Sequence, residues 1–273
     1  RGRGYTTACV GKWHLGWDAP FRPLSQGFDR FHGLPHTNDV REWKVGDAFT
    51  QLSMFTPLTR VEGERVVESP VDQAELTRHY TEEAVAFIRA NRDKPFFLYL
   101  PHTMPHVPQY ASPRFAGKSR GGLYGDTVEE LDWSTGVILD TLRELKLDAR
   151  TLVIFTNDNG GPTTRNAVNG SVNAPLRGSK CETFEGGIRV PMLMQWPGVI
   201  KAGCTYSKPT ITFDISATAL AAASVNPDGI DGVDLVPFIT GKAQGSPHDI
   251  LFWRSRTMSN NYGARYGDWK YVH

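Results

Sequence analysis

The sequence is short of cysteine, of net charge and of long apolar runs, and each shortage excludes a class of protein. Its three cysteines, Cys9, Cys181 and Cys204, are too few and too widely spaced for a disulfide framework or a zinc site. We expect each to be a small buried hydrophobic residue. The net charge of +1 argues against wholesale binding to nucleic acid or to an anionic membrane. No apolar run approaches the roughly 20 residues that a membrane span needs.

The order of apolar segments predicts a fold of alternating strands and helices. The 273 residues suit one large domain, or one domain with a piece of a second. We predict a doubly wound, mostly parallel α/β sheet flanked by helices, followed by the start of a small antiparallel domain. The boundary is placed between residues 244 and 245. Strands are expected at 5–10, 95–100, 152–155, 188–194 and 209–215, and helices at 72–91, 126–147, 214–223 and within 231–241.

Three details of this prediction depend on local patterns. In the second helix, Asp126 is expected to be the N-cap and Val128 to face inward. The tail from residue 251 onward reads as antiparallel strands with a turn at Gly267 and Asp268. Two long irregular segments, 17–71 and 162–187, are expected to serve function, because long loops without secondary structure are uncommon in compact domains.

The stretch TLVIFTNDNGG, residues 151–161, is the most informative of the predicted strands. Its four apolar residues favour a strand buried on both faces, as in a parallel sheet. The strand delivers Asn157, Asp158 and Asn159 into the following loop. A carboxylate beside a carboxamide supplies hard oxygen ligands for calcium or magnesium. The same residues are also typical of a plain turn, so this stretch alone leaves both readings open.

Four strand-end loops carry polar side chains that could do chemistry. Each has an ordinary structural explanation when it is taken singly, since most lysines are solvated and most loop histidines are structural. Together they predict a pocket at one sheet edge for an anion that develops negative charge, such as a sulfate or phosphate ester. The loops carry Lys12 with His14, His102 with His106, Asp158 with Asn159, and Lys180.

These loops also carry a family resemblance. GYTTACVGKWHLG is similar to the second hallmark motif of the formylglycine-dependent sulfatases, which belong to the alkaline phosphatase superfamily. PFFLYLPHTMPHVP resembles the strand and histidine segment of that family, TLVIFTNDNGG its metal loop, and LRGSKCETFEGGIRVPMLMQWPG its lysine loop. DGVDLVPFITG and GDWKYV resemble its closing segments, and FRPLSQGFDRFHGLPHTND is most like the arylsulfatase A branch. The similarity covers nearly the whole chain.

The resemblance implies roles for particular residues in catalysis and substrate binding. Lys12 and Lys180 would bind sulfate oxygens and offset charge in the transition state. His14 would hold a hydroxyl of the hydrated aldehyde, and His106 would contact the ester and protonate the leaving group. His102 is the weaker candidate, because the family motif points to the histidine just before Val-Pro. Thr37 would lie on the substrate wall.

The resemblance also implies a calcium ion. Asp158 and Asn159 would be two of its ligands, and the others would come from an upstream part of the protein. The family nucleophile is a cysteine or serine in C/S-x-P-S-R that is converted to formylglycine, and none of the three cysteines has that context. We therefore expect an N-terminally truncated sulfatase that is inactive by itself. The full-length protein would need a formylglycine-generating enzyme as its partner.

Alternatives to a sulfatase remain open at this point. The parent protein could be a phosphatase or phosphodiesterase of the same superfamily, or a sulfatase homologue that binds without catalysis. Aryl, carbohydrate and lipid sulfates are all hydrolysed by proteins with these motifs, so the substrate is undecided. By family, export to the periplasm, the lysosome or the medium is expected. The first residue is Arg1 and no signal peptide is visible, which says nothing about the compartment.

Overall fold

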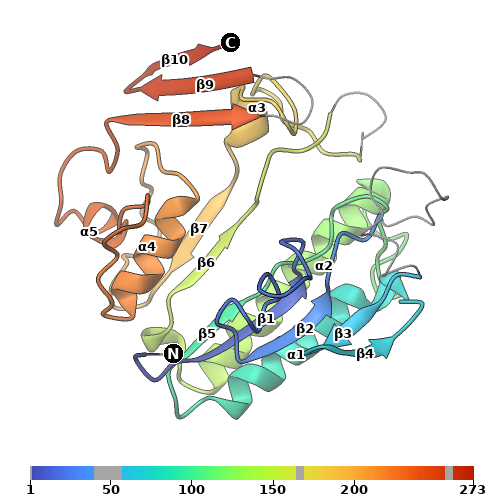
Figure 1. Ribbon diagram of the computed structural model, residues 1–273. Coiled ribbons are helices and arrows are strands. Elements are labelled where there is room, and N and C mark those ends of the chain that lie inside the picture. The colour runs from blue at the N-terminus through green and yellow to red at the C-terminus, as the bar shows by residue number, and fades with distance from the viewer. Residues whose placement is uncertain (1, 40–56, 164–168, 256–260) are drawn as a thin grey trace. The chain divides into compact units, whose positions relative to one another are not determined.

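The computed structural model describes residues 2–39, 57–163, 169–255 and 261–273 (Figure 1). The chain forms two compact units, Arg1–Lys146 and Leu147–His273, and each is described here by itself. Parts of the two predicted long loops, residues 40–56 and 164–168, lie outside the described residues. The predicted domain boundary at 244/245 stays a prediction.

The first unit is built on a five-stranded sheet with parallel pairing at its centre. β1 pairs in parallel with β2 on one side and with β5 on the other, whereas β2, β3 and β4 pair antiparallel. The order is therefore β4-β3-β2-β1-β5. The strands are β1 (Thr6–Lys12), β2 (Arg30–Leu34), β3 (Arg60–Glu62), β4 (Arg65–Glu68) and β5 (Phe96–Tyr99).

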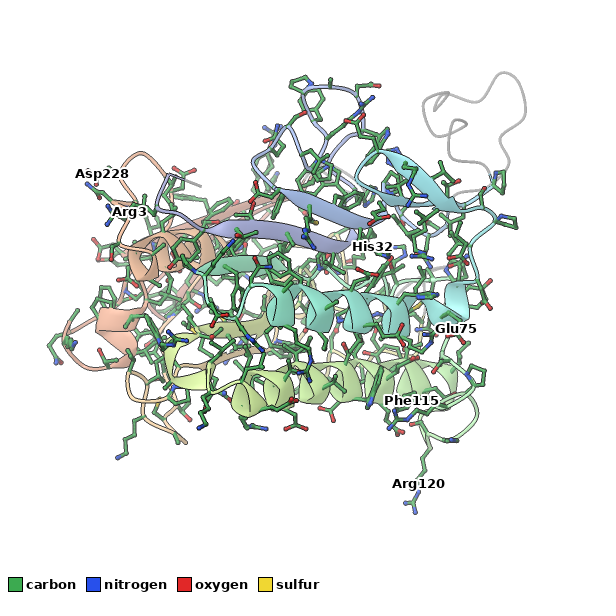
Figure 2. The ribbon with its side chains drawn as sticks, turned by 90° about the horizontal axis from the view of Figure 1, so that it is seen from below. Arg3, His32, Glu75, Phe115, Arg120 and Asp228 are labelled. Carbon is green, nitrogen blue, oxygen red and sulfur yellow. The ribbon has the colours of Figure 1, made fainter. Side chains whose placement is uncertain are left out.

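One helix packs on this sheet, and a second helix packs against the first. α1 (Leu76–Ala90) follows a short 3-10 turn, η2 (Gln73–Glu75), and packs against β1 and α2 (Gly122–Glu144). Figure 2 shows the two helices side by side. The helical spacing of apolar residues in α1 was read correctly, since Leu76, Tyr80, Ala84, Phe87 and Ile88 are all buried.

The predicted start of α2 is wrong. The helix begins at Gly122, and Asp126 lies in its second turn, 2% exposed. Its carboxylate accepts hydrogen bonds from the backbone N–H groups of Gly117, Lys118 and Ser119, so it orders the preceding loop instead of capping the helix. Val128 is 41% exposed and does not face inward as predicted.

The core of the first unit lies on both faces of β1. Ala8 and Val10 pack with Leu34 and with Leu76 and Tyr80 of α1. On the opposite face, Cys9 packs with Trp13, Trp17, Phe31 and Val61. The strand predicted at 5–10 is confirmed as β1, whose apolar centre is buried on both faces.

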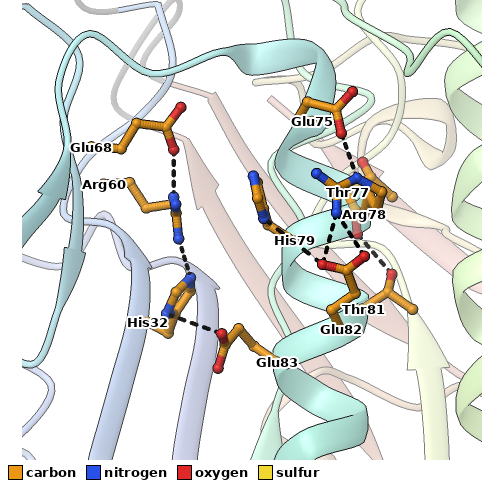
Figure 3. Close-up of polar contacts among 10 residues, drawn as sticks. All are labelled: His32, Arg60, Glu68, Glu75, Thr77, Arg78, His79, Thr81, Glu82 and Glu83. Carbon is orange, nitrogen blue, oxygen red and sulfur yellow. Dashed lines mark hydrogen bonds and ion pairs between the residues drawn. The ribbon is translucent and has the colours of Figure 1, made fainter.

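Polar side chains link the antiparallel strands β2, β3 and β4 of the same sheet. The His32 ring on β2 lies 2.6 Å from an Arg60 amino group on β3, and Arg60 pairs with Glu68 on β4 at 2.8 Å (Figure 3). Burial and the adjacent Arg60 charge lower the pKa of His32 to about 4. His32 is therefore neutral near pH 7 and accepts the guanidinium hydrogen bond.

The described part of the second unit contains two small antiparallel sheets and three short α-helices. β6 pairs antiparallel with β7, and the tail forms a sheet in the order β10-β9-β8. The predicted tail strands and their turn are confirmed. The elements are η3 (Asp148–Arg150), β6 (Val153–Thr156), α3 (Glu185–Ile188), β7 (Met192–Gln195), α4 (Phe213–Ala222), α5 (Val236–Ile239), β8 (Ile250–Ser255), β9 (Asn261–Tyr266) and β10 (Trp269–Val272).

Several expectations for strands and cysteines need correction. β6 pairs antiparallel and its Phe155 is 38% exposed, so it is not the doubly buried parallel strand predicted. β5 is also not fully buried, since the side chain of Phe97 is 42% exposed. Residues 209–215 form no strand, and 188–194 splits between the end of α3 and β7. Cys9 is buried as expected, but Cys181 is only half-buried and Cys204 is exposed. Among the described helices, none has the length and apolar character needed to cross a membrane.

Candidate active site

The carboxyl ends of β2, β1 and β5 meet at one edge of the first unit. The strands are neighbours and parallel, so the segments that follow them lie side by side, where ligands bind in open α/β sheets. The Lys12 N–H donates to the Pro101 carbonyl at 2.8 Å, and the Trp13 N–H donates to the Leu34 carbonyl at 2.9 Å. The three strand-end segments are therefore joined by their backbones.

Close backbone packing makes these hydrogen bonds between the strand-end segments possible. A methyl group on Gly11 would lie 2.1 Å from the Pro101 carbonyl oxygen, and the φ angle of Gly11 is +135°. Only glycine meets both conditions without displacing the neighbouring chain. The glycine of the sequence motif therefore sets the approach of β1 to the segment that carries the histidines.

His14 is presented by a strained turn that a buried tryptophan anchors. Its φ angle is +54°, in the left-handed region that costs free energy for a residue with a side chain. The backbone N–H of His14 donates to the Pro35 carbonyl at 3.1 Å. Trp13 is 7% exposed, and its indole N–H donates to the carbonyls of Gly16 and Phe21, both at 2.9 Å. The exposed His14 side chain thus extends from a well-anchored backbone.

His106 has a defined tautomer. Its Nδ1 lies 2.7 Å from the Val107 carbonyl oxygen, which can only accept, so Nδ1 carries the hydrogen. Nε2 of the neutral ring is then an acceptor, and it donates only when the ring is protonated. A role in protonating a leaving group therefore requires the imidazolium form.

His102 is half-buried and packs beside α1 and α2 of the first unit. Burial lowers its pKa to about 4. Its Nε2 lies 3.4 Å from the Ser134 hydroxyl, and its ring centroid lies 6.2 Å from that of Tyr80. These contacts are those of a structural histidine. The motif had likewise made His102 the weaker candidate for contact with the ester.

The segment after β2 adds a residue that the sequence reasoning missed. Burial and the nearby charge of His14 lower the pKa of His36, whereas Asp18 opposes the shift. His36 is separated only by Pro35 from the end of β2, the strand that pairs with β1, and this position was the available signal. The neighbouring Thr37 donates its hydroxyl hydrogen to Asp39 Oδ1 at 2.6 Å. Its role on a substrate wall stays a prediction.

In the second unit, the loop after β6 carries Asp158 and Asn159. The Asp158 side chain is exposed, and Asn159 Nδ2 donates to the Gly160 carbonyl at 3.0 Å. That bond uses the nitrogen of the carboxamide, so its oxygen remains to act as a ligand. One carboxylate and one amide oxygen fit a calcium ion, which takes about six to eight oxygen ligands in all. Within the described residues, no group of three or more His, Cys, Asp or Glu side chains could hold a metal.

The segment with Lys180 is bound to this loop through the backbone. The Lys180 N–H donates to the Gly161 carbonyl at 3.2 Å, and the Gly160 N–H donates to the Gly187 carbonyl at 2.9 Å. A methyl group on Gly160 would lie 1.8 Å from the Gly186 carbonyl oxygen. The structure therefore brings the predicted metal loop and lysine loop together.

Asn173 connects the two loops through its side chain. Its Oδ1 accepts from the Gly161 N–H at 3.0 Å, and its Nδ2 donates to the carbonyls of Gly161 and Gly178 at 2.7 and 3.0 Å. Sequence reasoning passed over this residue, because nothing in its local pattern distinguishes it from other loop asparagines. The convergence of the groups on the first and second units stays a prediction.

Comparison with known proteins assigns the chain to a family. The sulfatase family profile matches residues 1–225, and a profile described as the C-terminal part of N-sulphoglucosamine sulphohydrolase matches residues 179–273. The steryl-sulfatase of Mus musculus is 35% identical over 92% of this chain and 51% of its own length. The N-acetylgalactosamine-6-sulfatase of Mus musculus is 37% identical over 93% of this chain and 50% of its own length.

Solved structures agree with this assignment. The PsFucS1 sulfatase from Pseudoalteromonas sp. superposes with a TM-score of 0.85 at 28% identity, covering 98% of this chain and 58% of that one. The structure of Ps i-CgsB in complex with k-i-k-neocarrahexaose superposes with a TM-score of 0.81 at 26% identity, covering 99% of this chain and 63% of that one. The predicted α/β fold is thereby confirmed. The chain belongs to the sulfatase family, and it spans about half the length of the curated relatives it matches.

Proposed function

We propose that the full-length protein hydrolyses sulfate monoesters and that Lys12, His14, His106 and Lys180 take part in the reaction. One observation supports this most directly. Lys12 ends β1, and His14 and His106 lie in the segments after the parallel neighbours β1 and β5, in a chain that belongs to the sulfatase family. Cations at such an edge suit a substrate whose leaving oxygen gains negative charge.

The proposed division of labour follows from the charges involved. Sulfate ester cleavage builds charge on the bridging oxygen while the other sulfate oxygens remain charged. Lys12 and Lys180 would offset the charge on these oxygens, because fixed cations act most strongly where charge develops. His106, in its imidazolium form, would give its Nε2 proton to the leaving oxygen. His14 would hold a hydroxyl of the hydrated formylglycine.

We further propose that Asp158 and Asn159 are calcium ligands. A calcium ion held by these residues would supply positive charge that offsets the negative charge of the sulfate. The backbone bonds between the Asp158 loop and the Lys180 loop support this assignment, because they keep a ligand pair and a cation close together. The nucleophile would be a formylglycine outside residues 1–273, produced by a formylglycine-generating enzyme.

For the substrate we propose a small-molecule or carbohydrate sulfate ester, with Thr37 on the substrate wall. The support is that relatives are named for a steroid and an amino-sugar sulfate, and one structural neighbour holds an oligosaccharide. Export from the cytosol is proposed on family grounds.

The test uses the full-length protein, coexpressed with a formylglycine-generating enzyme and assayed on p-nitrophenyl sulfate and p-nitrophenyl phosphate. Calcium-dependent hydrolysis of the sulfate in preference to the phosphate is expected. Asp158→Ala should remove calcium stabilisation and most activity, whereas the exposed control Asp228→Ala should retain both. Hydrolysis of the phosphate alone would contradict the proposal, as would full activity in Asp158→Ala.

A further inference from the structure

The segment that follows Lys180 lies against the tail sheet of the second unit, which β8, β9 and β10 form. Ser255, at the end of β8, donates its hydroxyl hydrogen to the Cys181 carbonyl at 2.6 Å. Gly263 of β9 packs on Thr183, and a methyl group on Gly263 would lie 3.1 Å from the Thr183 Cβ. Figure 1 shows α3, which comes next in the chain, beside β8. Two strands of the tail sheet therefore contact the chain just after Lys180.

A partly buried cluster of charges attaches the end of this segment to the same sheet. Glu185, the first residue of α3, accepts a hydrogen bond from Lys270 Nζ at 2.6 Å, and Arg265 Nη2 lies 2.9 Å from the same carboxylate oxygen. The side chains of Lys270, Arg265 and Glu185 are 12%, 19% and 24% exposed. Burial acts to raise the pKa of Glu185, but the hydrogen bonds and charges of Lys270 and Arg265 outweigh it and lower the pKa. Removing one partner would leave a poorly solvated charge, so this attachment is specific.

Cys181 has a backbone conformation that its surroundings must maintain. Its φ angle is +72°, in the left-handed region that costs free energy for a residue with a side chain. Such a conformation persists only where neighbouring contacts enforce it. The Ser255 hydroxyl holds the carbonyl of Cys181, and the bond from the Lys180 N–H to the Gly161 carbonyl holds the preceding residue. The direction in which the chain leaves Lys180 therefore depends on a contact with β8.

We propose that the tail sheet positions Lys180 for the reaction. Three positioning residues act through the segment that follows Lys180, without contacting the substrate: Ser255, Arg265 and Lys270. This inference rests on the proposed function of Lys180 and extends it to residues far along the chain. The placement of a charged group matters because a displacement of about 1 Å can lower a rate about 100-fold.

Steady-state kinetics of the full-length protein on p-nitrophenyl sulfate test this inference, with rates expressed per mole of folded protein that carries formylglycine. Lys270→Met keeps the stem of the side chain but removes its charge, and should lower kcat/KM by about tenfold to 100-fold. Lys270→Arg keeps the charge and should retain most of the activity. Arg89→Met is the control, because it removes an exposed ion pair with Glu144 in the first unit, and kcat/KM should not change.

A double variant separates positioning from general stability. In the Lys180→Ala background, Lys270→Met should cause no further loss of kcat/KM, because residues that act through one group are not additive. A purely structural role would give the same loss in both backgrounds, and that result would overturn the inference. Wild-type kinetics in both Lys270→Met and Ser255→Ala would also overturn it. Wild-type activity in Lys180→Ala would contradict the proposed function of Lys180 itself and remove the basis of this inference.

Hydrogen exchange supplies a measurement that does not depend on activity. Ser255→Ala removes one hydrogen bond, so the protein should stay folded if Lys270→Met does not. The backbone N–H of Lys180 should exchange about five- to tenfold faster in Ser255→Ala, because the segment opens locally more often. The backbone N–H groups of α1 should exchange as in the wild type. Unaltered exchange at Lys180 would overturn the inference.

Discussion

Gly33 of β2 lies so close to Gly11 of β1 that a methyl group on Gly33 would be 1.8 Å from the Gly11 carbonyl oxygen. The two glycines are partners in the parallel register, one residue before Lys12 and Leu34. A larger residue at position 33 would have to displace the backbone of Gly11, which cannot move aside as the end of a flexible side chain can. This contact sets the distance between the segments that carry Lys12 and His36.

Gly33→Ala should therefore destabilise the protein by about 2–3 kcal/mol, as overpacking at a rigid contact does. We also expect lower activity in the full-length enzyme, because the strand ends must separate. Urea denaturation followed by circular dichroism measures the first effect. Gly136→Ala is the matched control, because Gly136 lies inside α2 with no atom within 4 Å of an added methyl group. It should be neutral or stabilising by up to about 1 kcal/mol. Equal stability of the two variants would contradict the role given to Gly33.

Asn173 should be a positioning residue for the proposed calcium site. Asn173→Ala removes three hydrogen bonds to the Gly161 and Gly178 backbone, which are worth about 0.5–1.5 kcal/mol each. We expect lower stability and weaker calcium stabilisation in thermal unfolding, although the side chain contacts no proposed ligand. Asn226→Ala removes one exposed hydrogen bond to Asp228 and serves as the control, with a small loss of stability and no change in the calcium effect. An unaltered calcium response in Asn173→Ala would show that the loops hold their arrangement without this link.

Stability should fall in acid because of His102. Its pKa is lowered from 6.5 to about 4 in the folded chain, so the unfolded chain binds the proton more readily. Its contribution is fully present above pH 6.5 and is lost as the pH falls toward 4. The size is about 3 kcal/mol if the shift is taken in full. Urea denaturation from pH 8 to pH 4 should show a shallower decline for His102→Phe than for the wild type. Parallel profiles would mean that His102 does not contribute.

Lys12 and Lys180 should act on the same charge in the transition state. In the full-length enzyme, each change to Ala should lower kcat/KM by about 100-fold or more. The double variant should lose less than the product of the two single effects, because residues that act as a unit are not additive. Steady-state kinetics on p-nitrophenyl sulfate measures all three, and the exposed Lys201→Ala is the control. Strictly multiplicative effects would indicate that the two lysines stabilise separate charges.

Residues 1–273 produced alone should not hydrolyse p-nitrophenyl sulfate, because none of the three cysteines lies in the context of the family nucleophile. Calcium should raise the melting temperature of this chain less than that of the full-length protein, since Asp158 and Asn159 supply only two of the ligands a calcium ion takes. Robust sulfatase activity of the 273-residue chain would overturn this expectation.

The fold was predictable where a local pattern and the final environment agreed. The face of α1 was read correctly because its helical spacing matches the surface it packs against. The start of α2 was predicted wrongly. Aspartate is a common N-cap residue, but the Asp126 carboxylate accepts hydrogen bonds from the backbone of the loop at 117–119. Likewise, the apolar run of β6 does not reveal its partner, and an antiparallel neighbour from a distant segment changed which residues are buried.

The sequence by itself determined the family and the residue types of the candidate site. The order of the motifs requires no knowledge of contacts, and side-chain chemistry belongs to each residue alone. Only the tertiary structure decided which of these residues come together. Burial lowered the pKa of His102, strand pairing placed His36 beside His14, and Asn173 linked the loops of Asp158 and Lys180. Such choices depend on contacts between segments far apart in the chain, and the free energy of those contacts cannot be read from any one segment.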